Sequence, residues 1–175
     1  MYRHDRLHFL KQQHQLAKNK NYYLGFKLVR GAYMEKENER AEEMEYVSPI
    51  CKNKAATDLN FDEALKYMVD NLDCMALFAG THNEASSYLL MQLIAEKGIE
   101  NNDKRIWFGQ LYGMSDHISF NLANLGYNVA KYVPFGPVKD VMPYLIRRAE
   151  ENTSVAGQTT RELSLLKKEK KRRNL

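Results

Sequence analysis

The stretch Met75-Ala-Leu-Phe-Ala-Gly80, followed at once by Thr81-His-Asn-Glu84, decides the fold class that we predict for this chain. A short run of small and apolar residues is typical of a strand that is covered on both faces, as in parallel sheets. Thr81-His-Asn-Glu84 has the pattern of a helix N-cap, so we expect a helix over Ala85–Lys97. A strand that leads directly into a helix is the repeating unit of a parallel α/β fold.

The same alternation continues on both sides of this unit. We expect three further strands, over Tyr23–Tyr33, Arg105–Gly109 and Asn128–Val133. We expect the other helices over Arg3–Lys18, Glu35–Tyr46, Asn60–Asp70 and Asp116–Leu125, with a loop over Tyr46–Asp58. Each strand is followed by glycine or polar residues, at the end where parallel α/β folds bind ligands.

The motifs after the strands favour a barrel over the other parallel folds. No Gly-x-Gly-x-x-Gly follows the first strand and no Gly-Lys-Ser/Thr motif is present, which argues against dinucleotide-binding and P-loop folds. Four strand–helix units are half of a (β/α)8 barrel. We therefore predict an α/β fold that is the C-terminal part of a distorted (β/α)8 barrel, followed by a basic C-terminal helix.

A second stretch predicts a binding function. Lys131–Pro137 reads as the end of a strand, and Pro143–Asn152 as a helix with Pro143 at its first position, where a missing N–H costs nothing. Four residues at i, i+3, i+4 and i+7 share one face of this helix: Tyr144, Arg147, Arg148 and Glu151. Paired guanidiniums beside a phenol and a carboxylate suit a small anionic ligand. A solvated helix face with i,i+4 pairs is the alternative, and spacing alone leaves it open.

Composition limits the classes of partner. The chain has 175 residues and a formal charge of +4, much of it in Lys167–Arg173, so the body is close to neutral and we expect no nucleic-acid partner. No run of 18 apolar residues occurs. Cys51 and Cys74 lack metal-ligand spacing, as do the histidines, so we predict no metal and a reducing compartment.

Five motifs in order resemble the proline dehydrogenase family. They are Lys27-Leu-Val-Arg-Gly-Ala-Tyr33, Phe78-Ala-Gly-Thr-His-Asn83, Phe108-Gly-Gln-Leu-Tyr-Gly-Met114, Tyr132-Val-Pro-Phe-Gly-Pro137 and Tyr144-Leu-Ile-Arg-Arg-Ala-Glu-Glu-Asn152. The resemblance covers Tyr2–Asn152. It implies a distorted barrel with FAD at the carboxyl ends of the strands. It also implies oxidation of L-proline to Δ1-pyrroline-5-carboxylate, with electrons passed to a quinone.

The resemblance also implies roles for single residues. The catalytic group that it implies is Tyr132, Tyr144, Arg147, Arg148 and Glu151, with the two arginines on the proline carboxylate and Glu151 holding them in place. The walls around the pyrrolidine ring are Tyr33, Leu111, Tyr132 and Tyr144. The cofactor-binding residues are Lys27, Val29, Gly31, Ala32, Thr81, His82, Asn83 and Gln110. For Gln110, satisfaction of nearby backbone is an open alternative.

The chain has no counterpart of the family's early strands. The family's early strands supply a lysine and an aspartate that have no counterpart here, so we expect a fragment that is inactive alone, with self-association of two halves as an alternative. We expect the barrel part over residues 1–157 and a basic helix or tail over 158–175. For the tail, peripheral membrane contact and a solvated helix both stay open. We predict a cytoplasmic location, with any membrane contact on the inner face of a respiratory membrane.

Other functions also stay open. The same barrel part is compatible with a non-catalytic carboxylate-binding or assembly module. It is also compatible with another flavin-dependent barrel oxidoreductase, such as a methylenetetrahydrofolate reductase. The pair Arg147 and Arg148 argues against the latter, because it suits a small carboxylate and not an extended pterin.

Overall fold

The computed structural model describes the backbone of residues 1–154 and 156–174, and the side chains of residues 1–148 and 163–174. The chain forms two compact units, Met1–Lys131 and Tyr132–Leu175. The domain boundary predicted at residues 157 and 158 falls inside the last helix, Ala156–Arg172.

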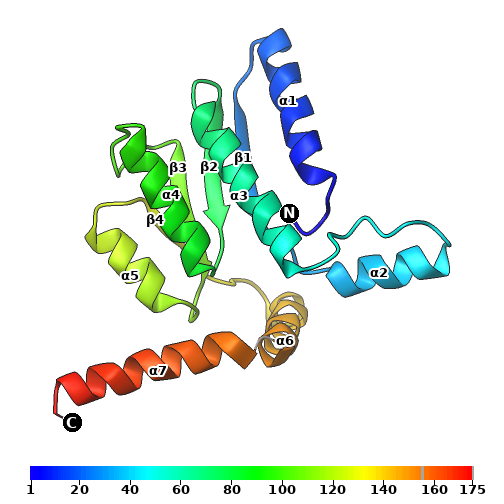
Figure 1. Cartoon of the computed structure of the whole chain (residues 1–175). Coiled ribbons are helices and arrows are strands. Elements are labelled where there is room, and N and C mark those ends of the chain that lie inside the picture. Colours follow the sequence, from blue (N-terminus) through cyan, green and yellow to red (C-terminus); the bar gives the residue numbers. More distant parts are fainter. Residues whose placement is uncertain (155, 175) are drawn as a thin grey trace. The chain divides into compact units, whose positions relative to one another are not determined.

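The first unit is a sheet with helices packed on one face (Figure 1). The strands lie in the order β1-β2-β3-β4 and are β1 Leu24–Val29, β2 Met75–Gly80, β3 Ile106–Leu111 and β4 Val129–Tyr132. The helices are α1 Arg6–Lys20, α2 Met34–Glu43, α3 Lys54–Asp70, α4 Glu84–Glu96 and α5 Asp116–Asn124. The second unit contains α6 Val138–Ser154 and α7 Ala156–Arg172. The predicted α/β class and the alternation of strands and helices are confirmed.

The register of the parallel strands gives the sheet two different faces. Leu28, Ala79 and Phe108 are register partners, and all three are buried. On this face α3 contacts β1 and β2, and α5 contacts β3. The neighbouring row, Lys27, Phe78 and Trp107, points the other way, because successive side chains of a strand alternate. Trp107 is 38% exposed there.

Two asparagines set where helices begin. Asn53 lies before α3 and accepts a hydrogen bond from the backbone N–H of Ala56 at 2.8 Å. This cap starts α3 at Lys54, six residues before the predicted start at Asn60. Asn83 caps α4 in the same way, accepting from the N–H of Ser86 at 3.0 Å. The N-cap predicted after β2 is therefore confirmed at Asn83. The cap at Asn53, within the loop expected over Tyr46–Asp58, was not predicted.

Pro143 does not begin its helix, contrary to prediction. It lies inside α6, which starts at Val138. The backbone carbonyl of Pro137 accepts hydrogen bonds from the N–H groups of Asp140 and Val141 at 2.9 and 3.1 Å. Helical bonding therefore begins directly after Pro137, and Pro143 follows more than a turn later.

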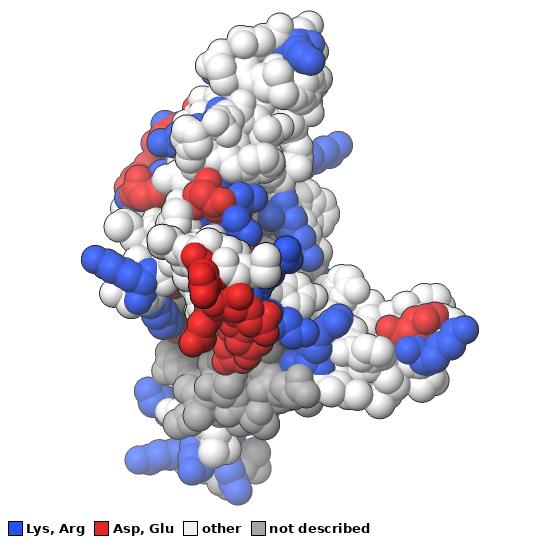
Figure 2. Space-filling view, turned by 90° about the vertical axis from the view of Figure 1, so that its right-hand side faces the viewer, with Lys and Arg blue, Asp and Glu red and all other residues white. Residues whose placement is uncertain are grey.

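Charge is unevenly distributed on the surface. Figure 2 looks onto the side where α2 projects in Figure 1, and it shows the largest group of Asp and Glu near the centre of the view, with smaller groups elsewhere. Helix α2 carries acidic residues in its first turn, Glu35 and Glu37, and Ala41 is its only buried residue. Among the described residues, no helix combines the length and the apolar composition that crossing a membrane requires.

Candidate active site

The carboxyl ends of β1, β2 and β3 lie side by side. Val29, Gly80 and Gly109 are register partners, and the N–H of Thr81 donates to the carbonyl of Gly109 at 3.1 Å. The residues that directly follow these three strands therefore lie along the same edge of the sheet. This is the edge at which parallel α/β folds bind their ligands.

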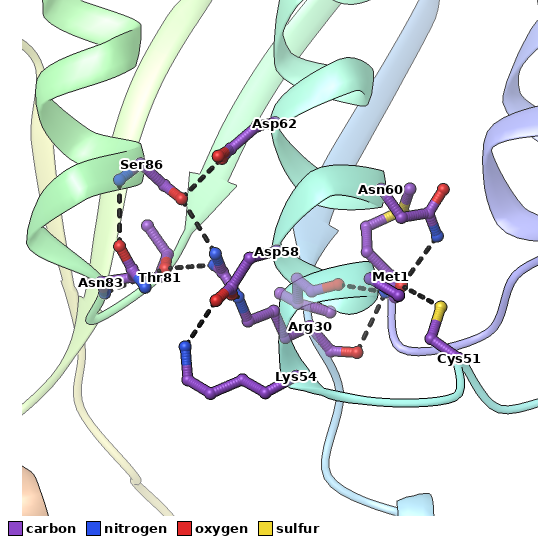
Figure 3. A network of polar contacts seen from close by, with 12 residues as sticks. Met1, Arg30, Cys51, Lys54, Asp58, Asn60, Asp62, Thr81, Asn83 and Ser86 are labelled. Carbon is purple, nitrogen blue, oxygen red and sulfur yellow. Dashed lines mark hydrogen bonds and ion pairs between the residues drawn. The ribbon is translucent and has the colours of Figure 1, made fainter.

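Arg30, directly after β1, is the centre of a polar network at this edge (Figure 3). Its Nε donates to Oδ1 of Asp58 at 2.7 Å, its Nη1 to Oγ1 of Thr81 at 3.0 Å, and its Nη2 to Oγ of Ser86 at 2.9 Å. The guanidinium also lies 4.3 Å from the ring centroid of Phe61. One side chain thus ties β1 to α3, to the end of β2 and to the start of α4.

A second layer of polar contacts supports Arg30. Ser86 donates through Oγ to Asp62 at 2.6 Å, and Lys54 pairs with Asp58 at 2.5 Å (Figure 3). Burial alone would raise the pKa of Asp58, but the hydrogen bonds from Lys54 and Arg30 outweigh it, and the pKa lies below its usual value. The carboxylate is therefore held in its charged form at neutral pH.

The segment after β2 is also strongly held. The hydroxyl of Thr81 is buried, and it accepts from the N–H of Asn83 at 3.1 Å as well as from Arg30. The Nδ1 of His82 lies 2.9 Å from Oγ of Ser115, which precedes α5. Of the three residues that the resemblance implies for cofactor binding here, Thr81 and Asn83 have structural contacts and His82 links two strand–helix units.

Gln110 lies within β3 and is 3% exposed. Its Nε2 donates to the carbonyl of Thr81 at 3.2 Å, and its Oε1 accepts from Oγ of Ser119 at 2.9 Å. Both ends of the amide are therefore used within the protein. This arrangement corresponds to the backbone-satisfying role that was left open for Gln110.

The residues of β1 and its extension lie on or beyond the open face of the sheet. Lys27 places its Nζ 5.6 Å from the ring centroid of Phe78, and Val29 is 37% exposed. Gly31 has φ +109°, and a Cβ there would lie 1.8 Å from the ring of Tyr2. A glycine is therefore required at this position for two reasons, the backbone conformation and the neighbouring ring. Ala32 and Tyr33 follow it and are exposed.

A hollow of about 370 Å³ opens on the same face of the sheet. Its lining comes from the first halves of three strands and the residue before β3: Gly25, Phe26, Lys27, Ala76, Leu77, Phe78, Arg105 and Trp107. Lys27 is the one residue that this lining shares with the residues predicted from the resemblance. The hollow is therefore a neighbour of the candidate site and does not coincide with it.

The second unit brings four of the predicted residues together. The rings of Tyr132 and Tyr144 meet edge to face, with centroids 5.6 Å apart and an interplanar angle of 63°. The guanidinium of Arg148 lies 5.2 Å from the ring centroid of Tyr144. The Nε of Arg147 is buried and has no hydrogen-bond partner among the described residues. Glu151 lies in α6, but its side chain is outside the described residues.

This group of the second unit has the chemistry of an anion site. Arg147 and Arg148 lie on one helix, the guanidinium of Arg148 lies against the ring of Tyr144, and the buried Nε of Arg147 has no acceptor among the described residues. Fork-shaped guanidinium donors match carboxylates in planar, bidentate geometry. Helical spacing predicts that Tyr144, Arg147 and Arg148 share one face of the helix, but it gives no sign of the contact with Tyr132.

Comparisons with known proteins agree with the motifs. The family described as "Proline dehydrogenase" matches residues 1–161. "Proline dehydrogenase 1, mitochondrial" from Homo sapiens is 43% identical over 155 residues, which is 87% of this chain and 26% of that protein. The Drosophila melanogaster protein of the same name is 41% identical over 167 residues, covering 90% of this chain and 24% of its own length.

A solved structure shows a similar fold. Proline utilization A from Bdellovibrio bacteriovorus, inactivated by N-propargylglycine, superposes with a TM-score of 0.81 at 29% identity. The superposition covers 87% of this chain and 16% of that one. The chain thus spans about a quarter of the length of the two curated relatives. Their names also overturn one prediction: they are mitochondrial proteins, so the expected cytoplasmic location is wrong.

Proposed function

Because the chain belongs to the proline dehydrogenase family, we propose that it carries the C-terminal strand–helix units of an enzyme that oxidises L-proline. The proposed product is Δ1-pyrroline-5-carboxylate, the proposed cofactor is FAD, and the proposed electron acceptor is a quinone. The names of the relatives favour a mitochondrial location for this chemistry.

The buried Nε of Arg147 is the observation that carries the substrate proposal. A buried donor that lacks an acceptor costs about 1–3 kcal/mol, so such donors are uncommon outside functional sites. The carboxylate of proline would supply the acceptor. The adjacent guanidinium of Arg148, which lies against the ring of Tyr144, would supply the second cation of the clamp.

Flat and mostly apolar side chains would enclose the pyrrolidine ring. We assign this role to Tyr132 and Tyr144, whose rings meet in the second unit, and we separately propose Tyr33 and Leu111 as ligand-contacting residues of the first unit. Tyr132 is 50% exposed and Tyr33 is 46% exposed in this chain, so both have surface to offer a ligand. Their contact with the ring would exclude water and fix the orientation of the reacting carbon.

The first unit has features that fit a flavin. The side chains of Val29 and Lys27 lie over Gly80, where a Cβ would come within 2.9 Å of a methyl group of Val29. Val29 is 37% exposed and Lys27 adds a cation, so this face offers a planar ring an apolar surface beside a positive charge. When bound, FAD supplies the acceptor for hydride from the substrate. The residues that we propose to hold it are Lys27, Val29, Gly31, Ala32, Thr81, His82 and Asn83, whereas both ends of the Gln110 amide are already used within the protein.

The experiment that tests this function is a chimera. Residues 1–161 of this chain replace the matching segment of the human relative, and the absorption spectrum is recorded before and after L-proline is added. We expect a bound flavin that bleaches with L-proline and recovers its colour when a quinone is added. In the matched variant Arg147→Lys we expect the flavin to stay bound and bleaching to be slowed, since lysine lacks the forked donors.

Two outcomes would overturn parts of the proposal. A folded chimera without flavin would refute the cofactor assignment. A flavin-loaded chimera that L-proline does not bleach would refute the substrate assignment. The spectrum of the 175-residue chain itself, with and without FAD and L-proline, then shows how much of the activity it has alone.

A further inference from the structure

We propose that His14, Asp73 and Cys74 form a binding site for a transition-metal dication, with zinc as the best fit. His14 lies in α1, and the other two residues lie in the turn between α3 and β2. One ligand atom from each residue lies within 4.8 Å of the other two. This proposal does not depend on the proposed function.

The buried imidazole of His14 is the observation that sets this cluster apart. His14 is 3% exposed, and its Nδ1 lies 2.6 Å from the phenolic oxygen of Tyr67. Its Nε2 is buried and has no hydrogen-bond partner among the described residues. Metal-ligating histidines commonly have this arrangement, in which an outer partner holds one ring nitrogen and leaves the other for the metal. The ring is also fixed by edge-to-face packing on Tyr67, with centroids 5.5 Å apart.

The donor atoms select the class of metal. One imidazole nitrogen, one thiol sulfur and one carboxylate oxygen suit zinc, whereas magnesium and calcium prefer oxygen ligands alone. A tetrahedral zinc with bonds of about 2.0–2.3 Å holds its ligand atoms roughly 3.3–3.8 Å apart, so the three atoms have to move about 1 Å closer together than the 4.8 Å within which they lie. Asp73 is exposed and Cys74 is half-buried, so small rotations of their side chains can close the site. Three protein ligands leave a fourth position for water.

The site lies at the end of the sheet opposite to the candidate active site. Cys74 directly precedes β2, and its carbonyl accepts a hydrogen bond from the N–H of Leu24 at the start of β1, at 2.9 Å. Strands of this length place the two ends roughly 17–20 Å apart. A metal here would join α1 to the beginning of two strands, so we assign it a structural role and not a catalytic one.

Sequence spacing gave no sign of this site. His14 is far along the chain from the Asp73–Cys74 pair, and neither cysteine has a second cysteine or histidine at a short interval. Only the packing of α1 against α3 brings the ligands together. Lys18, on the same helix as His14, acts electrostatically on both His14 and Cys74 and opposes a bound cation, whereas Asp73 favours it.

Cobalt is the most direct probe, because a thiolate bound to Co²⁺ gives an intense near-ultraviolet charge-transfer absorption. We expect Co²⁺ to bind the metal-free 175-residue chain with a stoichiometry of one and to show this absorption. Zinc should displace the cobalt and raise the melting temperature. In Cys74→Ser we expect the charge-transfer absorption to vanish and zinc affinity to fall by at least about 10-fold. The matched control is Cys51→Ser, which removes the other free cysteine and should leave both properties unchanged.

A second variant keeps the test decisive if Cys74→Ser folds poorly. Asp73→Asn changes an exposed side chain and should weaken zinc binding while the thiolate absorption remains. Failure of the wild-type chain to bind either metal would overturn the proposal. So would charge-transfer absorption that survives in Cys74→Ser or is lost in Cys51→Ser.

Discussion

Arg30 and Arg147 are both largely withdrawn from water, yet their surroundings differ in kind. Arg30 donates from all three guanidinium nitrogens to acceptors of its own unit, and its plane lies against Phe61. Arg147 lies on α6 with its buried Nε unpaired among the described residues. Each guanidinium nitrogen of Arg30 donates at least one hydrogen bond within its own unit, whereas the buried Nε of Arg147 has no acceptor among the described residues. We therefore propose that Arg30 supports the fold and that Arg147 binds a ligand.

The largest expected difference between Arg147 and Arg30 is in the rate at which L-proline reduces the flavin. Arg147→Met in the chimera should slow the reduction of flavin by L-proline by about 100- to 1,000-fold, because one partner of a charge-assisted contact is lost. The melting temperature should stay close to that of the parent chimera. Stopped-flow absorption and thermal melts measure the two quantities. A fall in stability as large as that in Arg30→Met would erase the distinction.

The second effect is expected on stability. Arg30→Met leaves Asp58 with Lys54 as its remaining cation and removes donors from Thr81 and Ser86, so we expect a loss of about 2–4 kcal/mol in the free energy of unfolding. Urea titration of the 175-residue chain measures it. The control is Arg6→Met, whose pair with Asp5 is more exposed and should cost less than about 1 kcal/mol. Equal losses in the two variants would contradict the supporting role of Arg30.

A smaller effect is expected at Gln110. Gln110→Leu leaves the carbonyl of Thr81 and the hydroxyl of Ser119 without this partner, which should cost about 1–3 kcal/mol of stability. Ser119 keeps a second acceptor, the carbonyl of Ser115 at 3.3 Å, so adding Ser119→Ala should recover only a small part of the loss. Urea titration of both single variants and the double variant completes the cycle. Independent, additive effects would mean that the two side chains are not coupled.

The smallest effect is a dependence of stability on pH. The folded pKa of Asp58 lies below the unfolded value, so its contribution is complete above the unfolded pKa of about 4 and is lost as the pH falls through the folded pKa. We expect Asp58→Asn to flatten the acid side of the stability curve below about pH 4. Thermal melts across this range measure the slope. An unchanged slope would mean that other carboxylates dominate acid unfolding.

The sequence predicted those features that depend on neighbours along the chain. The strand Met75–Gly80 has the predicted limits because a short apolar run ends in glycine and a helix cap. The grouping of Tyr144, Arg147 and Arg148 follows from helical spacing. Pro143 was placed wrongly because proline is tolerated at a first helical position, and the earlier start after Pro137 has no stronger local signal.

Features built from distant segments were not predictable in this way. The local sequence gives no sign of the role of Arg30, because its partners Asp58, Thr81 and Ser86 lie 28 to 56 positions away. The orphaned nitrogen of His14 has the same origin, since it depends on the packing of two helices. Side chains alternate between the two faces along each strand, and this can be predicted from the sequence. The face on which Trp107 lies depends on the register of β3 with β2, which the sequence does not give.

Trp107 also makes the open face of the sheet observable by spectroscopy. It is the sole tryptophan of the chain, so the indole fluorescence comes from one place, beside Phe78 and Lys27. Any layer of protein laid over this face would shift the emission to shorter wavelength, and a flavin nearby would quench it by energy transfer. The chain therefore contains its own optical reporter for the surface on which β1, β2 and β3 present their uncovered side chains.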